Sequence, residues 1–154
     1  MTELPPPPDD PNRASVAASL FAEVLVVEQL ARAMIGRTLP GGMQISHISV
    51  LNLLAHISEE RTPAQLAEAF HLTRGAMSNT LARLEWAGHV HIRPDWDDAR
   101  RKFVSISPTG RAARDAALAA ILPAMSDVVR DIGAERVRAA LPVLRALRDR
   151  LEPD

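Results

Sequence analysis

The feature that most constrains the fold is a pair of consecutive helix starts in the middle of the chain. The run Thr62-Pro63-Ala64-Gln65 predicts a sharp helix N-terminus, because threonine caps, proline suits the first helical position and glutamine completes the capping box. The helix it opens is short, and a brief turn at His71 and Leu72 follows. Thr73 then predicts the cap of a longer helix that ends at Gly88, where a left-handed terminating residue is expected.

Both helices have one apolar side, and two short strands follow them. The inward residues predicted by the helical period are Leu66, Ala67 and Phe70 in the first helix and Met77, Leu81 and Leu84, flanked by Thr80, in the second. Residues 89–93 alternate with their even positions apolar, and residues 102–106 indicate the returning strand. The loop between them, residues 94–101, is charged. Two helices joined by a few residues and followed by a hairpin form the winged helix-turn-helix arrangement.

Further helices are predicted on both sides of this segment. They cover about residues 15–37, 46–58 and 109–132, and a last helix carries apolar residues at 137, 141, 144, 147 and 151. Pro123 should kink the third of these, and a bend or a split is expected at Pro142. Residues 1–14 form a proline-rich arm that we expect to be disordered. The predicted fold class is therefore mainly α with a small β-hairpin wing.

The composition of the chain excludes several classes of function. The chain of 154 residues is 47% hydrophobic and 24% charged, which suits one globular domain with a core. The absence of cysteine excludes disulfides, thiolate catalysis and cysteine-based redox sensing. The chain contains no uninterrupted apolar run of about 18 residues, so no membrane span is predicted. Its acidic, proline-rich start does not resemble a secretory signal. We therefore expect a cytoplasmic protein without a membrane partner.

The charge is unevenly distributed although the net charge is only −1. Residues 71–114 contain eight basic and four acidic residues, hence +4, and all basic residues of the chain except Lys102 are arginine. A local basic surface is what attracts a polyanion. In the winged arrangement, the helix from Thr62 lies across the DNA backbone and the helix from Arg74 enters the major groove, which is about 12 Å wide.

The outward face of that second helix and the wing supply the candidate DNA-binding residues. In the recognition helix they are Thr73, Arg74, Gly75, Ser78, Asn79 and Arg83, and in the wing they are Asp98, Arg100, Arg101 and Lys102. Polar side chains and arginines bind base edges or phosphates, and small residues such as Gly75 allow close approach. An arginine on the wing suits a narrow minor groove.

The same residues resemble the MarR family of transcription regulators. Thr62–Ala67 is similar to the first helix of that family's motif, and Thr73–Gly88 (TRGAMSNTLARLEWAG) to its recognition helix. The wing signature D-x-R-x-x-x-V-x-L-T-x-x-G is matched by Asp98, Arg100, Val104 and Gly110, with Ile106 and Ser107 at the usual Leu and Thr positions. The spacing of the wing signature relative to the recognition helix makes the match fairly specific.

The resemblance implies a homodimer that binds double-stranded DNA. Residues 15–45 and 109–154 would form the dimerisation region, and residues 46–108 the DNA-binding domain. Two recognition helices would meet successive major grooves roughly 34 Å apart on a near-palindromic site. Arg100 would reach the minor groove, with Asp98 positioning its guanidinium. The resemblance further implies a repressor that a small-molecule effector relieves, although no ligand-binding residues can be named.

Two alternatives remain open from the sequence. The acidic residues Asp95, Asp97 and Asp98 and the nearly neutral net charge also suit a winged-helix module that binds protein and not DNA. His89 and His91 share one strand face, but a metal site needs three or four convergent ligands, so we expect no metal. No nucleophile–base pair or phosphate loop is present, and we therefore expect neither a cofactor nor enzymatic activity.

Overall fold

The computed structural model describes residues 11–152, which fall into two units divided between Arg37 and Thr38. The first unit is formed by helix α1 (Arg13–Thr38), which starts two residues inside the predicted arm. The rest of that proline-rich arm, residues 1–10, lies outside the described residues.

Helix α1 is apolar and exposed in the single chain. None of its residues is buried, and its exposed apolar side chains include Val16, Phe21, Leu25, Val26, Val27 and Leu30. By length and composition alone, α1 could cross a membrane, a test that core helices and signal sequences also pass. Glu23 and Glu28 interrupt its apolar residues, so the stricter criterion of an uninterrupted apolar run is not met.

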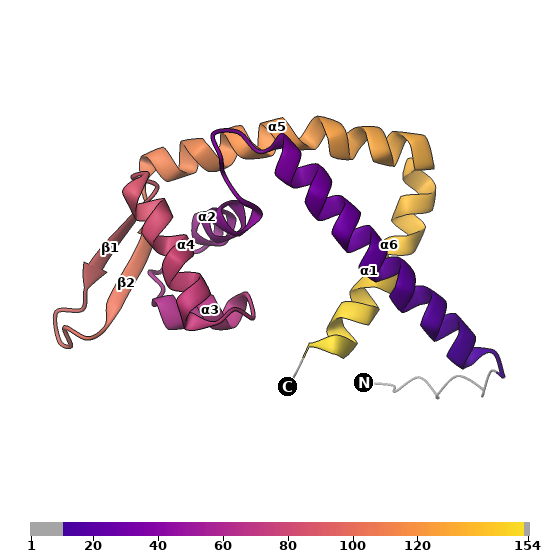
Figure 1. Cartoon of the computed structure of the whole chain (residues 1–154), viewed down its shortest axis with the longest axis horizontal. Helices are drawn as coiled ribbons and strands as arrows, with labels where there is room; N and C mark the ends of the chain where they lie inside the picture. Colours follow the sequence, from indigo (N-terminus) through magenta and orange to yellow (C-terminus); the bar gives the residue numbers. More distant parts are fainter. Residues whose placement is uncertain (1–10, 153–154) are drawn as a thin grey trace. The chain divides into compact units, whose positions relative to one another are not determined.

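The second unit contains all the other elements (Figure 1). In chain order they are α2 (Ile45–His56), α3 (Pro63–Ala69), α4 (Arg74–Trp86), β1 (Val90–Pro94), β2 (Lys102–Ile106), α5 (Pro108–Ile132) and α6 (Ala134–Leu151). The predicted fold class is confirmed, since a mainly helical chain carries one antiparallel hairpin. Helices α5 and α6 continue through Pro123 and Pro142, so the split considered at Pro142 does not occur. A proline disturbs only the turn before it, and the remaining hydrogen bonds hold the helix together.

The two predicted caps are present. The Thr62 hydroxyl accepts the Gln65 N–H at 3.2 Å, while the Gln65 side-chain oxygen accepts the Thr62 N–H at 2.9 Å. The Thr73 hydroxyl accepts the Ala76 N–H at 3.2 Å. Each bond satisfies a backbone donor that the first helical turn leaves free. Gly88 follows the end of α4 with a φ of 73°, the left-handed conformation that glycine adopts without strain.

The core of the second unit lies between α2, the helix pair and the hairpin. It consists of Val50, Leu51, Leu54, Leu66, Ala67, Met77, Leu81, Leu84, Val90 and Val104. The predicted inward residues are confirmed, except that Phe70 is only partly buried and packs against this core. Complete burial of one leucine contributes about 1.5–3 kcal/mol, so this core holds α3 and α4 in a fixed mutual position.

The hairpin is attached to the helices at both ends. Its strands pair from Val90 opposite Ile106 to Pro94 opposite Lys102. Arg61, just before α3, adds an antiparallel bridge to Val104 through backbone bonds of 3.1 and 2.8 Å. This bridge, which the sequence did not predict, ties the start of α3 to the wing.

A tight junction links the end of α4 to the start of α5. The buried Ser107 hydroxyl donates to the Gly88 carbonyl oxygen at 2.6 Å and accepts the Gly110 N–H at 2.9 Å. The Ser107 N–H donates to the His89 carbonyl oxygen at 3.0 Å. A Cβ atom on Gly110 would lie 1.9 Å from that same oxygen, so only glycine fits here.

This close approach predicts that Gly110→Ala is strongly destabilising. The added methyl group must displace backbone, and we expect the free energy of unfolding to fall by about 2–3 kcal/mol. Gly36→Ala is the control, because a Cβ at this exposed position in α1 meets nothing within 4 Å. It should stabilise the protein slightly or leave it unchanged. Urea unfolding measures both, and an unchanged midpoint for Gly110→Ala would contradict the junction.

Candidate nucleic-acid interface

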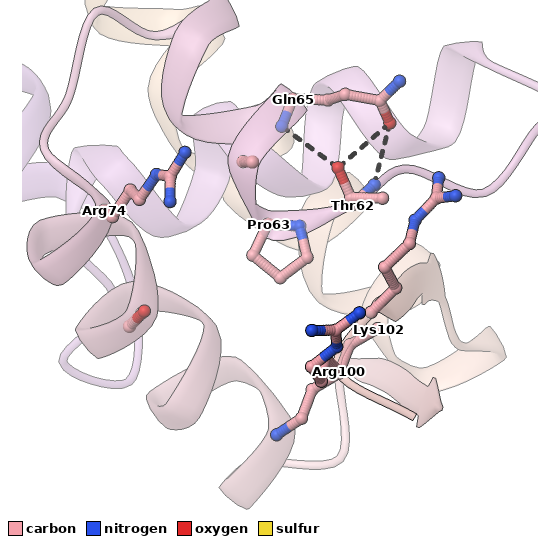
Figure 2. Close-up of a pocket in the computed structure, with 9 residues that line it drawn as sticks. Thr62, Pro63, Gln65, Arg74, Arg100 and Lys102 are labelled. Carbon is pink, nitrogen blue, oxygen red and sulfur yellow. Dashed lines mark hydrogen bonds between the residues drawn. The ribbon is translucent and has the colours of Figure 1, made fainter. Parts of the chain in front are cut away.

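A concave surface of about 520 Å³ lies where α3, α4 and the wing meet (Figure 2). Its lining residues are Thr62, Pro63, Ala64, Gln65, Arg74, Ser78, Arg100, Arg101 and Lys102. We call this surface the basic concavity. Five of the ten predicted DNA-binding residues line it, and they come from two separate elements, the recognition helix and the wing.

The basic concavity is electropositive. Arg74, Arg100, Arg101 and Lys102 contribute four cationic side chains, and none of the lining residues is acidic. Figure 2 shows Arg74 on one side of the start of α3 and the wing residues Arg100 and Lys102 on the other. Converging cations beside a polar helix start are suited to bind the phosphates of a polyanion.

Asp98 binds Arg100, as the sequence analysis expects of a residue that positions the Arg100 guanidinium. One carboxylate oxygen of Asp98 accepts the Arg100 backbone N–H at 3.0 Å and its side-chain Nε–H at 3.2 Å. The backbone hydrogen bond lowers the pKa of Asp98 most, followed by the side-chain bond. The Arg100 side chain is still 92% exposed, so the guanidinium remains open to a partner.

A second wing arginine is also paired. Arg101 lies 3.8 Å from Asp95, and its guanidinium is 5.6 Å from the centre of the Phe103 ring. Asp95 and Asp98 therefore each face an arginine of the wing. Two of the three acids in the loop are thus partners of its arginines.

The base of the wing is held by an ion pair that the sequence did not predict. Arg93 donates through Nε to Glu60 at 3.0 Å and makes a second bond to the other carboxylate oxygen. The hydrogen bond to Glu60 raises the pKa of Arg93. Arg93 also lies 5.0 Å from the Phe103 ring, a cation–π distance. The sequence indicates only a charged turn at Glu60, since a contact across 33 residues leaves no local signal.

The other predicted recognition-helix residues have different positions. The Thr73 hydroxyl is occupied by its cap bond, and Gly75 has open space where a side chain would be. Asn79 is exposed but does not line the basic concavity. Arg83 lines a different cavity near the end of α4.

Sequence reasoning also missed lining residues at the start of α3. Thr62, Pro63, Ala64 and Gln65 line the basic concavity, although none of them was among the predicted site residues and only their helix was expected to lie across the DNA backbone. The sequence signal from which these lining residues could have been found was the capping box that marks the helix start. Among residues 11–152, no group of three or more histidine or acidic residues could hold a metal ion.

Comparison with known proteins agrees with this architecture. Residues 41–101 match the model of the MarR family. Over these residues the chain is similar to the MarR family. Proteins of the MarR family are transcription regulators and not enzymes. No curated protein matches the chain.

Several solved structures share the fold at low sequence identity. A MarR-family transcriptional regulator from Rhodococcus sp. RHA1 is 21% identical, with a TM-score of 0.75 over 85% of this chain and 93% of its own. A probable transcriptional regulator from Pseudomonas aeruginosa is 21% identical, with a TM-score of 0.72 over 86% and 98%. A mutant of E. coli MarR, solved in complex with operator DNA, is 19% identical, with a TM-score of 0.73 over 90% and 99%.

The Asp98 geometry predicts a measurable titration. The pKa of Asp98 should lie below its usual value of 3.8, because both hydrogen bonds favour the carboxylate. Arg100→Gln removes the side-chain bond and keeps the backbone bond, so the pKa should rise part of the way. Lys102→Gln is the charge-matched control, and it should leave Asp98 nearly unaffected. Carbon-13 NMR of the carboxyl group over a pH titration gives the answer, and a normal pKa in the unaltered protein would contradict the pairing.

Proposed function

We propose that this protein is a dimeric regulator of transcription that binds a specific, near-palindromic site on double-stranded DNA. Each lobe would place α4 in a major groove and Arg100 of the wing in the neighbouring minor groove. The observation that carries the proposal is the basic concavity, in which four cations from α4 and the wing converge without a lining acid. A relative with the same fold, the E. coli MarR mutant, was solved with operator DNA, which supports the same type of partner here.

The assignment of roles follows from the geometry. Arg74 and Lys102 lie at opposite sides of the basic concavity and are the candidates for phosphate contacts (Figure 2). Ser78 and Asn79 are exposed on α4 and are the candidates for base edges. The Arg101 side chain is less exposed than that of Arg100, 59% against 92%, and it lies 3.8 Å from Asp95.

Exposed apolar side chains support the homodimer. In the single chain, the exposed apolar residues of the last two helices include Leu122, Met125, Val128, Val129 and Ile132 of α5 and Leu141, Val143 and Leu144 of α6. Helix α1 has no buried residue and exposes a further apolar set. Surfaces of this kind are rarely left open to water, and a second copy of the chain would cover them.

The finer regulatory features are part of the same proposal. We infer a repressor located in the cytoplasm, where its DNA is, and released from that DNA by a small molecule. Such a ligand would act by favouring dimer conformations whose lobe spacing does not fit the site. The chain offers no residue set from which to name this effector.

Selection of bound fragments from genomic DNA tests the function. The purified protein should enrich a small set of near-palindromic fragments over random duplex of equal length. Affinity for the enriched site should fall steeply with salt, because phosphate neutralisation releases counterions. Equal binding to random duplex would contradict sequence-specific regulation. No binding to any duplex, together with capture of a protein partner, would favour the protein-binding module considered from the acidic loop.

The wing makes a separate prediction. Arg100→Gln should weaken binding to the selected site by about tenfold or more, since a specific arginine contact contributes about 1–3 kcal/mol. Arg145→Gln, the same charge change on the exposed face of α6, is the matched control and should bind like the unaltered protein. Fluorescence anisotropy with labelled duplex measures both variants. Equal loss in the two variants would assign the effect to net charge and not to the wing.

A further inference from the structure

The segment before α3 is attached to both strands of the hairpin. Glu60 binds Arg93 of β1 through its carboxylate: one oxygen accepts from Nε at 3.0 Å, and the other accepts from a terminal guanidinium nitrogen. The next residue, Arg61, is bridged to Val104 of β2 by backbone hydrogen bonds of 3.1 and 2.8 Å. We call the Glu60–Arg93 pair the wing clamp. Attachments on two different strands restrain the tilt of the hairpin more than either does alone.

The Arg93 side chain is engaged within the chain and is less open to DNA than Arg100. Its remaining guanidinium nitrogen donates to the Pro94 carbonyl oxygen at 3.2 Å, so each of its three nitrogens has an acceptor in the protein. Its side chain is 41% exposed, against 92% for Arg100. Neither Glu60 nor Arg93 lines the basic concavity. The pair is therefore placed to act on DNA binding through the residues that it positions.

A continuous set of contacts leads from the wing clamp to the tip of the wing. Arg93 and Arg101 lie 5.0 and 5.6 Å from the centre of the Phe103 ring, and Phe103 is paired opposite Arg93 in the hairpin. The Arg101 N–H then donates to the Asp98 carbonyl oxygen at 2.9 Å. The Asp98 carboxylate in turn binds the backbone and the side chain of Arg100. The wing clamp and Arg100 are thus joined by direct contacts at every step.

We propose that Glu60 is a positioning residue for DNA binding. By holding Arg93, it fixes the angle of the wing, so that Arg100 reaches the minor groove while α4 occupies the major groove. The inference rests on the proposed function and extends it to a residue outside the contact surface. A wing that is ordered before it meets DNA binds more tightly, because less ordering entropy is lost on binding.

The negative charge of Glu60 makes the direction of its effect decisive. Glu60 lies two residues before Thr62, which lines the basic concavity, so its carboxylate is near the surface proposed to bind phosphates. If Glu60 acted only through its charge, its removal would strengthen DNA binding. If Glu60 positions the wing, its removal weakens DNA binding. The sign of the change separates these two roles.

Three variants test this sign by fluorescence anisotropy on the DNA site selected with the unaltered protein. Glu60→Gln keeps the size of the side chain but replaces one acceptor oxygen by an amide nitrogen, which cannot accept from Arg93. Arg93→Gln removes the other partner, and the double variant has the net charge of the unaltered protein. All three should bind about threefold more weakly or worse, and the double variant should be no weaker than Arg93→Gln, because the pair is lost only once.

Glu59→Gln is the matched control. It makes the same charge change at the neighbouring residue, whose side chain is 81% exposed and lies 3.8 Å from Arg61. Because Glu59 is not part of the wing clamp, this variant should bind DNA as tightly as the unaltered protein or more tightly.

Two further measurements separate positioning from a folding defect. In an Arg100→Gln background, Glu60→Gln should cause no additional loss, because the contact that it positions is already absent. A folding defect would persist in that background. Without DNA, Glu60→Gln should speed hydrogen exchange of the Val104 N–H, which donates to the Arg61 carbonyl oxygen at 2.8 Å, and Glu59→Gln should not.

The outcomes distinguish this inference from the proposed function. Equal or tighter DNA binding by Glu60→Gln would overturn the inference alone, as would a loss that persists with Arg100→Gln or an unchanged exchange rate at Val104. If the unaltered protein binds no duplex, the proposed function fails and the inference fails with it.

Discussion

The relation between the recognition helix and the wing depends on one small hydrogen-bonded junction. Ser107 joins the carbonyl of Gly88 to the first turn of α5, and its backbone binds His89. The α5 backbone at Gly110 approaches His89 so closely that no side chain fits between them. The end of α4, the start of the hairpin and the start of α5 therefore behave as one unit. Together with the Arg61 bridge to Val104, this unit fixes the mutual position of the cations on α4 and on the wing.

The wing shows how a chain of nearly neutral net charge can still present a basic surface. Two of its three carboxylates are paired within the loop: Asp98 binds the backbone and side chain of Arg100, and Asp95 faces Arg101. An internally paired acid orders the loop without cancelling the outward charge, since Arg100 is 92% exposed. The position of each charge, and not the sum of the charges, decides which surface a polyanion meets.

The sequence was sufficient to predict structural features that depend only on residues close together in the chain. Thr62 with Gln65, Thr73 and Gly88 each act within one helical turn, and the structure confirms all three. Contacts between distant segments were not predicted, among them the Arg61 bridge to Val104 and the Glu60 pair with Arg93. In the sequence, His47 is one of several scattered histidines. Its burial follows from the packing of α2 against α4, which no spacing within the sequence encodes.

Helix α4 carries two cations with different surroundings. Arg74 is its first residue and lines the basic concavity, whereas Arg83 lies nine residues later, about 13 Å along the axis, and lines the separate cavity near the end of α4. Between them, Met77 and Leu81 are buried in the core, as is the following Leu84, so the helix moves as a rigid element if it moves at all. A contact made at Arg83 therefore acts on the same rigid body that positions Arg74.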